Sequence, residues 1–126
     1  MRIDGFDARV ERIGQPIGDA LIRLLGTRIL EHTGDRGYPA RFENDQFAVL
    51  VPGPSASETA AETDALRKHI AKRNFSIRGS GAEIGTVTFS CAVCTLKRGE
   101  SATELLSRTQ SLLADALHQG GDIVLS

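Results

Sequence analysis

Two short apolar segments joined by a polar turn lie near the middle of the chain and most constrain its fold. Residues 38–42 and 47–51 have the composition of strands, and the four residues 43–46 between them are polar. Two such strands with so short a connection form a β-hairpin. Residues 18–32 carry apolar side chains at helical spacing, so we expect a long helix directly before the hairpin.

Two capping boxes mark the starts of two further helices. Ser55 is followed three residues later by Glu58, and Ser101 by Glu104, a pattern in which each residue of the pair satisfies a backbone N–H of the other. The first of these helices is predicted to run to about Arg73. The second ends before two consecutive glycines at 120 and 121.

The remaining segments have the pattern of strands. They are a short strand at 75–78, a Gly-Ser-Gly turn, a strand from about 84 to 93 and a last strand at 122–126. This order predicts a two-layer α+β domain, in which helices pack on one mostly antiparallel central sheet. No internal repeat or linker divides the chain, so we expect residues 1–126 to form a single domain.

Charge and hydropathy argue against several classes of partner. Fifteen basic and sixteen acidic residues leave a net charge of -1, which predicts no nucleic acid partner and no membrane contact. No apolar run has the length of a membrane span, and the first five residues are too polar to begin a secretory signal. The expected location is cytoplasmic.

The two cysteines form a Cys-x-x-Cys pattern, which in other settings belongs to redox motifs or zinc sites. Here Cys91 and Cys94 fall in a segment that reads as a strand, where a separation of three residues places two side chains on opposite faces. We therefore expect buried apolar thiols that do not meet.

Residues 40–52 resemble the signature segment of the GGDEF family, the diguanylate cyclases. Ala40-Arg41-Phe42 precedes a five-residue signature at 43–47, and Ala-Val-Leu-Val-Pro follows it. Further matching motifs, at matching spacing over essentially the whole chain, are Ile3-Asp4, Phe6, Gly14, Gly18-Asp19, Thr88-Phe89-Ser90 and Gly120-Gly121-Asp122. The resemblance implies the palm-like fold of nucleotide cyclases, with a ferredoxin-like βαββαβ core.

Active members of the family join two GTP molecules into cyclic di-GMP with the help of divalent metal. The resemblance places Arg2 and Asp45 at the two positions whose carboxylates hold that metal. A permanent cation at Arg2 repels a metal ion, so we expect no metal and no cofactor. We expect the Arg2 side chain to fill the metal's place and to pair with Asp45 or Glu43.

The other substrate-contacting positions are also altered. The signature glycines become Glu43 and Asn44, its fourth position is Gln46, and only Asp45 and Phe47 are retained. The guanine-binding positions are Val10 and Asp19, of which Asp19 is more simply read as a helix-terminus residue, and Asp45 as a turn residue. The phosphate-contacting basic positions fall on Leu117 and Gly121, and the product-inhibition motif is absent from residues 34–37, where Asp35-Arg36 reads as a solvated pair.

We therefore expect no catalytic residue, and a chain that is not an enzyme. The vestigial active-site positions are Arg2, Val10, Asp19, Glu43, Asn44, Asp45, Gln46 and Phe47. The expected role is that of a degenerate bacterial GGDEF domain, a regulatory, protein-interaction or dimerisation module in cyclic di-GMP signalling. The alternatives are a module that binds GTP or cyclic di-GMP without turnover and, ranked last, an active diguanylate cyclase.

The resemblance also implies partners. The signature segment and the Gly-Gly-Asp close are most similar to the degenerate GGDEF domains of FimX-like GGDEF-EAL proteins, which implies type IV pilus control and a PilZ-type partner. Neighbouring domains of EAL, PAS or receiver type and a homodimer are expected. Because only residues 1–4 remain for the first strand, we expect that strand to be truncated and the chain to be a piece of a longer protein.

Overall fold

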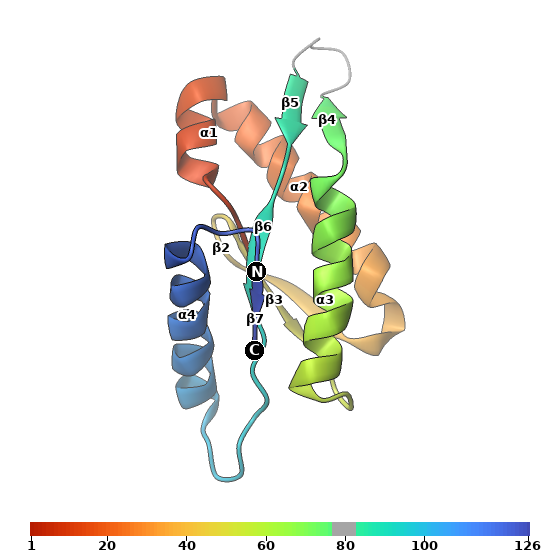
Figure 1. Cartoon of the computed structure of the whole chain (residues 1–126), viewed down its shortest axis with the longest axis vertical. Coiled ribbons are helices and arrows are strands. Elements are labelled where there is room, and N and C mark those ends of the chain that lie inside the picture. Colours follow the sequence, from red (N-terminus) through yellow and green to blue (C-terminus); the bar gives the residue numbers. More distant parts are fainter. Residues whose placement is uncertain (77–82) are drawn as a thin grey trace.

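The computed structural model describes residues 1–76 and 83–126 (Figure 1). In chain order the elements are β1 (Arg2–Ile3), α1 (Phe6–Ile13), α2 (Gln15–Thr33), a 3₁₀ turn (Gly34–Arg36), β2 (Tyr38–Glu43), β3 (Gln46–Leu50), α3 (Ala56–Ala71), β4 (Asn74–Ser76), β5 (Glu83–Thr86), β6 (Phe89–Ala92), α4 (Ala102–His118) and β7 (Val124–Leu125). The predicted Gly-Ser-Gly turn and the end of the strand predicted at 75–78 lie outside the described residues.

Five strands form the main sheet in the order β2-β3-β1-β6-β7. The first three pairings are antiparallel, and β7 joins β6 in parallel. Strands β4 and β5 form a separate two-stranded ribbon beyond the end of α3 (Figure 1). The predicted α+β architecture, with helices on a mostly antiparallel sheet, is confirmed.

The two-residue strand β1 lies at the centre of the sheet. Arg2 faces Gln46 on β3 and Ser90 on β6, and Ile3 faces Phe89. Additional hydrogen bonds run from the Met1 amine to the Phe47 carbonyl at 2.8 Å and from the Asp4 amide to the Thr88 carbonyl at 3.0 Å. Residue 2 is thereby fixed beside the turn between β2 and β3.

The helices differ from prediction mainly before the hairpin. The chain forms an unpredicted helix, α1, and the following helix α2 begins at Gln15 rather than Gly18. Gly14, at φ 91°, separates the two helices, and Pro16 sits in the first turn of α2, where its missing N–H costs nothing. Both predicted capping boxes, at Ser55 and Ser101, are confirmed.

The strand predicted from 84 to 93 is two strands. Residues 83–86 pair with β4, whereas 89–92 pair with β1 and β7. Arg9 on α1 holds β5 outside the main sheet. Its guanidinium donates to the Thr86 carbonyl at 2.8 Å and to the Ile84 carbonyl at 3.4 Å. Apolar alternation runs through both strands, so the pattern did not reveal the change of partner.

The main core lies between the sheet and helices α2 and α3. Phe89 and Leu21 are fully buried, and Ile3 and Ile29 are nearly so. Helix α4 packs against β6 and β7 and buries Leu113 and Ala116. Within the described part of the chain, no helix is both long and apolar enough to cross a bilayer.

Candidate functional site

The signature turn connects β2 to β3 beside the central strand β1. Arg41 pairs with Phe47, but the next pair is Glu43 with Gln46, so β2 carries one extra residue. The Arg41 side chain folds back over the turn and donates to the Asn44 carbonyl at 2.7 Å and the Glu43 carbonyl at 3.5 Å. The turn thus has a fixed backbone.

An ion pair joins the signature turn to β1. The Arg2 Nε donates to the Asp45 Oδ2 at 2.6 Å, and the Arg2 Nη2 lies 3.5 Å from the Asp7 carboxylate. Only 8% of the Asp45 side chain is exposed, against 32% of the Arg2 side chain. The hydrogen bond to Asp45 raises the pKa of the Arg2 guanidinium, so the pair is a permanent cation with a buried carboxylate.

This arrangement confirms the expectation that Arg2 pairs with Asp45, and it does not fit a divalent metal. A metal ion bound to the Asp45 carboxylate would lie beside the Arg2 guanidinium and not beside a second acid. The two positive charges would repel each other strongly at this distance. In residues 1–76 and 83–126, no three His, Cys, Asp or Glu side chains are grouped so that they could hold a metal ion. The reading of Asp45 as a turn residue is incomplete, because its carboxylate is buried against Arg2.

The two positions that the resemblance assigns to guanine binding, Val10 and Asp19, lie on α1 and α2. Val10 is half-buried and packs against the core, and a Cβ on Gly18 would lie 2.6 Å from its Cγ2 atom. The interhelical contact therefore holds the Val10 side chain. Asp19 is exposed and accepts a hydrogen bond from the Gln15 side chain at 2.9 Å. Because α2 begins four residues earlier, the reading of Asp19 as a helix-terminus residue is wrong.

The remaining signature residues divide by burial. Glu43 and Asn44 are exposed, and the Gln46 amide donates to the Glu43 carboxylate at 3.3 Å. Phe47 is buried beside Gly26 of α2, where a Cβ would lie 3.3 Å from its ring. The sheet therefore brings Arg2 together with the signature turn, while Val10 and Asp19 belong to the two helices that precede it.

A second polar cluster around Asp4 was not predicted. The Asp4 carboxylate accepts hydrogen bonds from the fully buried Ser90 hydroxyl at 2.7 Å and from the Asp122 amide at 2.8 Å. Arg67 of α3 binds the Asp122 side chain and thereby joins the cluster to that helix. Ser90 belongs to the Thr-x-Ser motif and Asp122 to the Gly-Gly-Asp motif. No local pattern in the sequence connects either motif to Asp4.

Arg36, in the window of the missing product-inhibition motif, has a partner on α3. Its guanidinium lies 3.0 Å from the Glu62 carboxylate and donates to the His32 carbonyl at 2.9 Å. Asp35 and Arg36 are both exposed, as predicted, but the partner of Arg36 is Glu62 and not Asp35.

Two hollows border α4, and neither includes Arg2 or Asp45. The larger, about 570 Å³, lies between β3, α4 and the segment after β6, and both cysteines line it. Cys91 is buried, which raises the pKa of its thiol, and Cys94 is half-buried. β6 ends at Ala92, so strand alternation does not extend to Cys94. Because both cysteines line the same hollow, the predicted placement on opposite faces is wrong.

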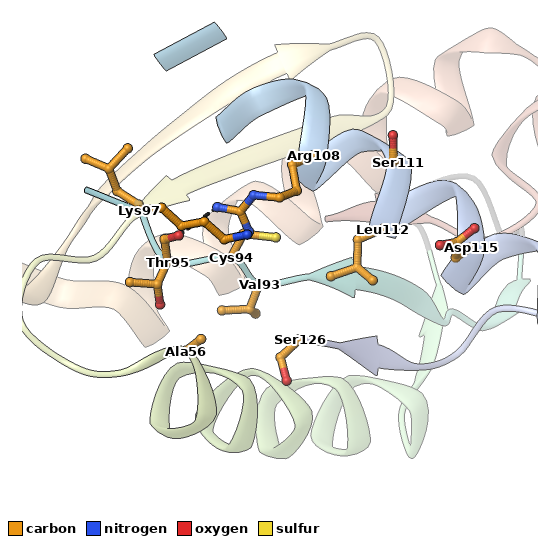
Figure 2. Close-up of a pocket in the computed structure, with 11 residues that line it drawn as sticks. Ala56, Val93, Cys94, Thr95, Lys97, Arg108, Ser111, Leu112, Asp115 and Ser126 are labelled. Carbon is orange, nitrogen blue, oxygen red and sulfur yellow. Dashed lines mark hydrogen bonds between the residues drawn. The ribbon is translucent and has the colours of Figure 1, made fainter. Parts of the chain in front are cut away.

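The smaller hollow, about 500 Å³, lies at the far end of β6 from the signature turn (Figure 2). Arg108 reaches across it to the Thr95 carbonyl at 2.7 Å and binds Glu100 at 2.8 Å. Arg108, with the Lys97 backbone amide, lowers the pKa of Glu100 to about 2. This ion pair holds the loop between β6 and α4, a structural role.

The sequence of this chain matches a known protein family over nearly its whole length. The family described as "Diguanylate cyclase, GGDEF domain" matches residues 1–122. Diguanylate cyclase VdcA of Vibrio cholerae is 28% identical over 123 residues, which cover 98% of this chain and 36% of VdcA. The chain thus spans about a third of the length of this curated relative.

Solved GGDEF domains have the same fold. The GGDEF domain of DgcB from Caulobacter crescentus, solved in complex with c-di-GMP, superposes with a TM-score of 0.89 at 25% identity, over 98% of this chain and 72% of that one. The FimX GGDEF domain from Pseudomonas aeruginosa superposes with a TM-score of 0.84 at 23% identity, over 99% and 76%.

The expectation that this chain is not an enzyme is wrong. It was drawn from individual replaced side chains, whereas the match over nearly the whole chain is to an enzyme family whose relative VdcA is named a diguanylate cyclase. The recognition of the family from the signature segment is confirmed: this chain belongs to the GGDEF domain family of diguanylate cyclases.

Proposed function

We propose that this domain serves cyclic di-GMP signalling as a regulatory domain, through contacts with a neighbouring domain, a protein partner or a second copy of itself. The Arg2–Asp45 ion pair is the observation that carries the proposal. It ties the signature turn to β1, so the turn is a preformed and rigid surface. Its exposed part, Glu43 and Asn44, faces solvent and is available for contact.

Two further observations support a role in protein contact. The large hollow beside α4 is bordered by exposed apolar side chains, among them Phe42, Leu50 and Leu106. A GGDEF protein of the same fold, the diguanylate cyclase SiaD from Pseudomonas aeruginosa, was solved in complex with its activator SiaC, at a TM-score of 0.84 and 17% identity. A protein contact is therefore compatible with the fold.

The setting of the domain is part of the proposal. We place the chain in a larger cytoplasmic protein with an EAL, PAS or receiver domain, and its coverage of about a third of VdcA supports the greater length. The likeness to an EAL/GGDEF domain protein from M. capsulatus, at a TM-score of 0.78 and 23% identity, supports an EAL neighbour. The likeness to the FimX domain motivates the narrower form of the proposal, a PilZ-type partner and type IV pilus control.

Hydrogen exchange tests the proposed contact. Exchange of peptides from residues 38–50 and 102–118 is measured in the isolated domain and in the full-length parent protein. We expect slower exchange of at least one of these peptides in the parent, while peptides from α1 exchange alike in both. Equal exchange of both peptides in the two samples would overturn the contact with a neighbouring domain.

Cation binding tests the role given to Arg2. Titration with Mn²⁺, followed by paramagnetic broadening of NMR signals, should leave the signature turn of the wild-type chain unchanged. Arg2→Asp creates a pair of acids and should gain Mn²⁺ broadening at the turn, whereas Arg12→Asp, at an exposed arginine of α1, should not. Mn²⁺ binding at the turn of the wild-type chain would contradict this role. Formation of cyclic di-GMP from GTP in the same samples would show that the regulatory contacts belong to an active cyclase.

A second candidate function is binding of GTP or cyclic di-GMP without turnover. The Asp19 carboxylate favours it, since it is exposed to solvent and accepts a hydrogen bond from the Gln15 side chain. Calorimetry with GTP and Mg²⁺, and separately with cyclic di-GMP, tests this candidate. Heat that disappears in Asp19→Asn would support it, and silence at millimolar ligand would remove it.

A further inference from the structure

Arg41 contacts the backbone of the signature turn on the side of β2. The irregular register between Arg41 and Glu43 leaves one unpaired residue, Phe42, immediately before the turn. A bulge of this kind interrupts the regular ladder of hydrogen bonds. The carbonyl groups of Glu43 and Asn44 instead accept hydrogen bonds from the Arg41 guanidinium.

Arg2 contacts the next residue of the same turn from the side of β1. Its Nε binds the Asp45 carboxylate at 2.6 Å, and the Asp45 carbonyl accepts a long hydrogen bond from the Ile3 amide at 3.5 Å. Asn44 and Asp45 share a peptide bond, whose carbonyl oxygen is the one that Arg41 binds at 2.7 Å. Rotation of that peptide group would therefore move the Asp45 side chain relative to Arg2.

We infer that Arg41 is a positioning residue, which holds the Asn44–Asp45 peptide in the orientation that presents the Asp45 carboxylate to Arg2. A guanidinium suits this task because its planar set of N–H donors can hold two carbonyl oxygens at once. Two arginines from different strands thus hold one turn. Arg41 binds the backbone carbonyls of the turn, and Arg2 binds the Asp45 carboxylate.

This inference rests on the same ion pair as the proposed function, but it concerns the geometry of the pair in the isolated chain. A domain that made no protein contact would overturn the proposed function and leave the inference about Arg41 standing. If a substitution of Arg41 left the geometry of the ion pair unchanged while protein contacts were present, the inference would be overturned and the proposed function would stand.

The experiment follows the Arg2 Nε–H signal in ¹H–¹⁵N NMR spectra of the full 126-residue chain. In the wild type, the hydrogen bond to Asp45 should shift this signal downfield and slow its exchange with water. In Arg41→Gln we expect exchange to become about tenfold faster, because the turn opens locally more often. Arg12→Gln, which removes an exposed arginine on α1, is the matched control and should leave the signal unchanged.

A loss of global stability is distinguished by a second signal. The Cys91 amide donates to the Ile123 carbonyl at 2.9 Å inside the sheet, so its exchange reports unfolding of the domain. We expect it to keep its wild-type rate in Arg41→Gln. An Arg2 signal that exchanges at the wild-type rate in this variant overturns the inference.

Arg41→Lys keeps the test decisive if Arg41→Gln does not fold. A lysine ammonium is a compact point charge without the planar fork of a guanidinium, so the Arg2 Nε–H should exchange faster than in the wild type. An exchange rate in Arg41→Lys equal to that of Arg12→Gln would overturn the inference.

Discussion

The Arg2 Nε lies 2.6 Å from the Asp45 Oδ2, although the two residues are 43 positions apart along the chain. The contact exists because β1 inserts between β3 and β6, which places residue 2 opposite Gln46, next to Asp45. The Asp45 side chain is almost fully buried, and the Arg2 guanidinium lies directly against its carboxylate. The pair therefore affects both the stability of the sheet and the chemistry that the turn permits.

Removal of Arg2 should destabilise the domain. Arg2→Met leaves a buried carboxylate without its partner, and because about a third of the arginine side chain is exposed, water screens part of the effect. We expect a loss of about 1–2 kcal/mol in the free energy of unfolding, measured by urea denaturation. Arg12→Met is the control, and in an Asp45→Asn background the Arg2→Met substitution should cost less. Equal costs in both backgrounds would contradict a direct interaction.

Gly121 should not tolerate a side chain. Its φ is +77°, and a Cβ would lie 2.8 Å from the Asp4 Oδ1, so Gly121→Ala adds a steric clash to backbone strain. Gly99 has φ +78° with open space around it, and Gly99→Ala therefore carries the strain alone. We expect both variants to lose stability, and Gly121→Ala to lose about 1–3 kcal/mol more in urea denaturation. Equal losses would show that Asp4 moves away without cost.

Acid should weaken the loop between β6 and α4. Arg108 and the Lys97 amide lower the pKa of Glu100 from 4.5 to about 2, so the folded state favours the charged form. The resulting stability is present above pH 4.5 and is lost as the pH falls from 4.5 toward 2. Urea midpoints between pH 7 and about 3 should fall more steeply for the wild type than for Glu100→Gln. Glu11→Gln, at an exposed position on α1, should follow the wild type.

The capping box of α4 should contribute measurably to stability. The Ser101 hydroxyl accepts a hydrogen bond from the Glu104 amide at 3.1 Å, and Ser101→Ala leaves that amide without its partner. We expect a loss of about 1 kcal/mol in the free energy of unfolding. Ser107→Ala, at an exposed position within the same helix, should be neutral or slightly stabilising. A loss as large at Ser107 would refute the capping explanation.

Features that depend on nearby residues were predicted well from the sequence. Both capping boxes involve residues three apart, and the hairpin connects strands through a short turn, so local pattern was sufficient for both. The family was recognised from the signature segment because its residues are contiguous. The Arg2–Asp45 pair was predicted because the resemblance placed two opposite charges at neighbouring positions of the site.

The prediction about enzyme activity was made from single replaced positions, and the comparison over nearly the whole chain corrected it. The replaced residues Arg2, Val10 and Glu43 led to the expectation of a chain that is not an enzyme, and the match to an enzyme family over residues 1–122 overturned it. A fold and its family depend on the packing of many side chains, so a few altered positions do not define them.

The sequence by itself determined the hairpin, three of the helices, the two capping boxes and the family. Only the tertiary structure decided the existence of α1, the division of one apolar run into β5 and β6, the packing of Val10 against Gly18, and the clamp of Asp4 on Ser90 and Asp122. The clamp joins residues 86 and 118 positions apart, and Arg9 fixes β5 from 75 positions away. Such contacts form because the core brings distant segments together, and no local pattern of hydrophobicity or charge records which segments meet.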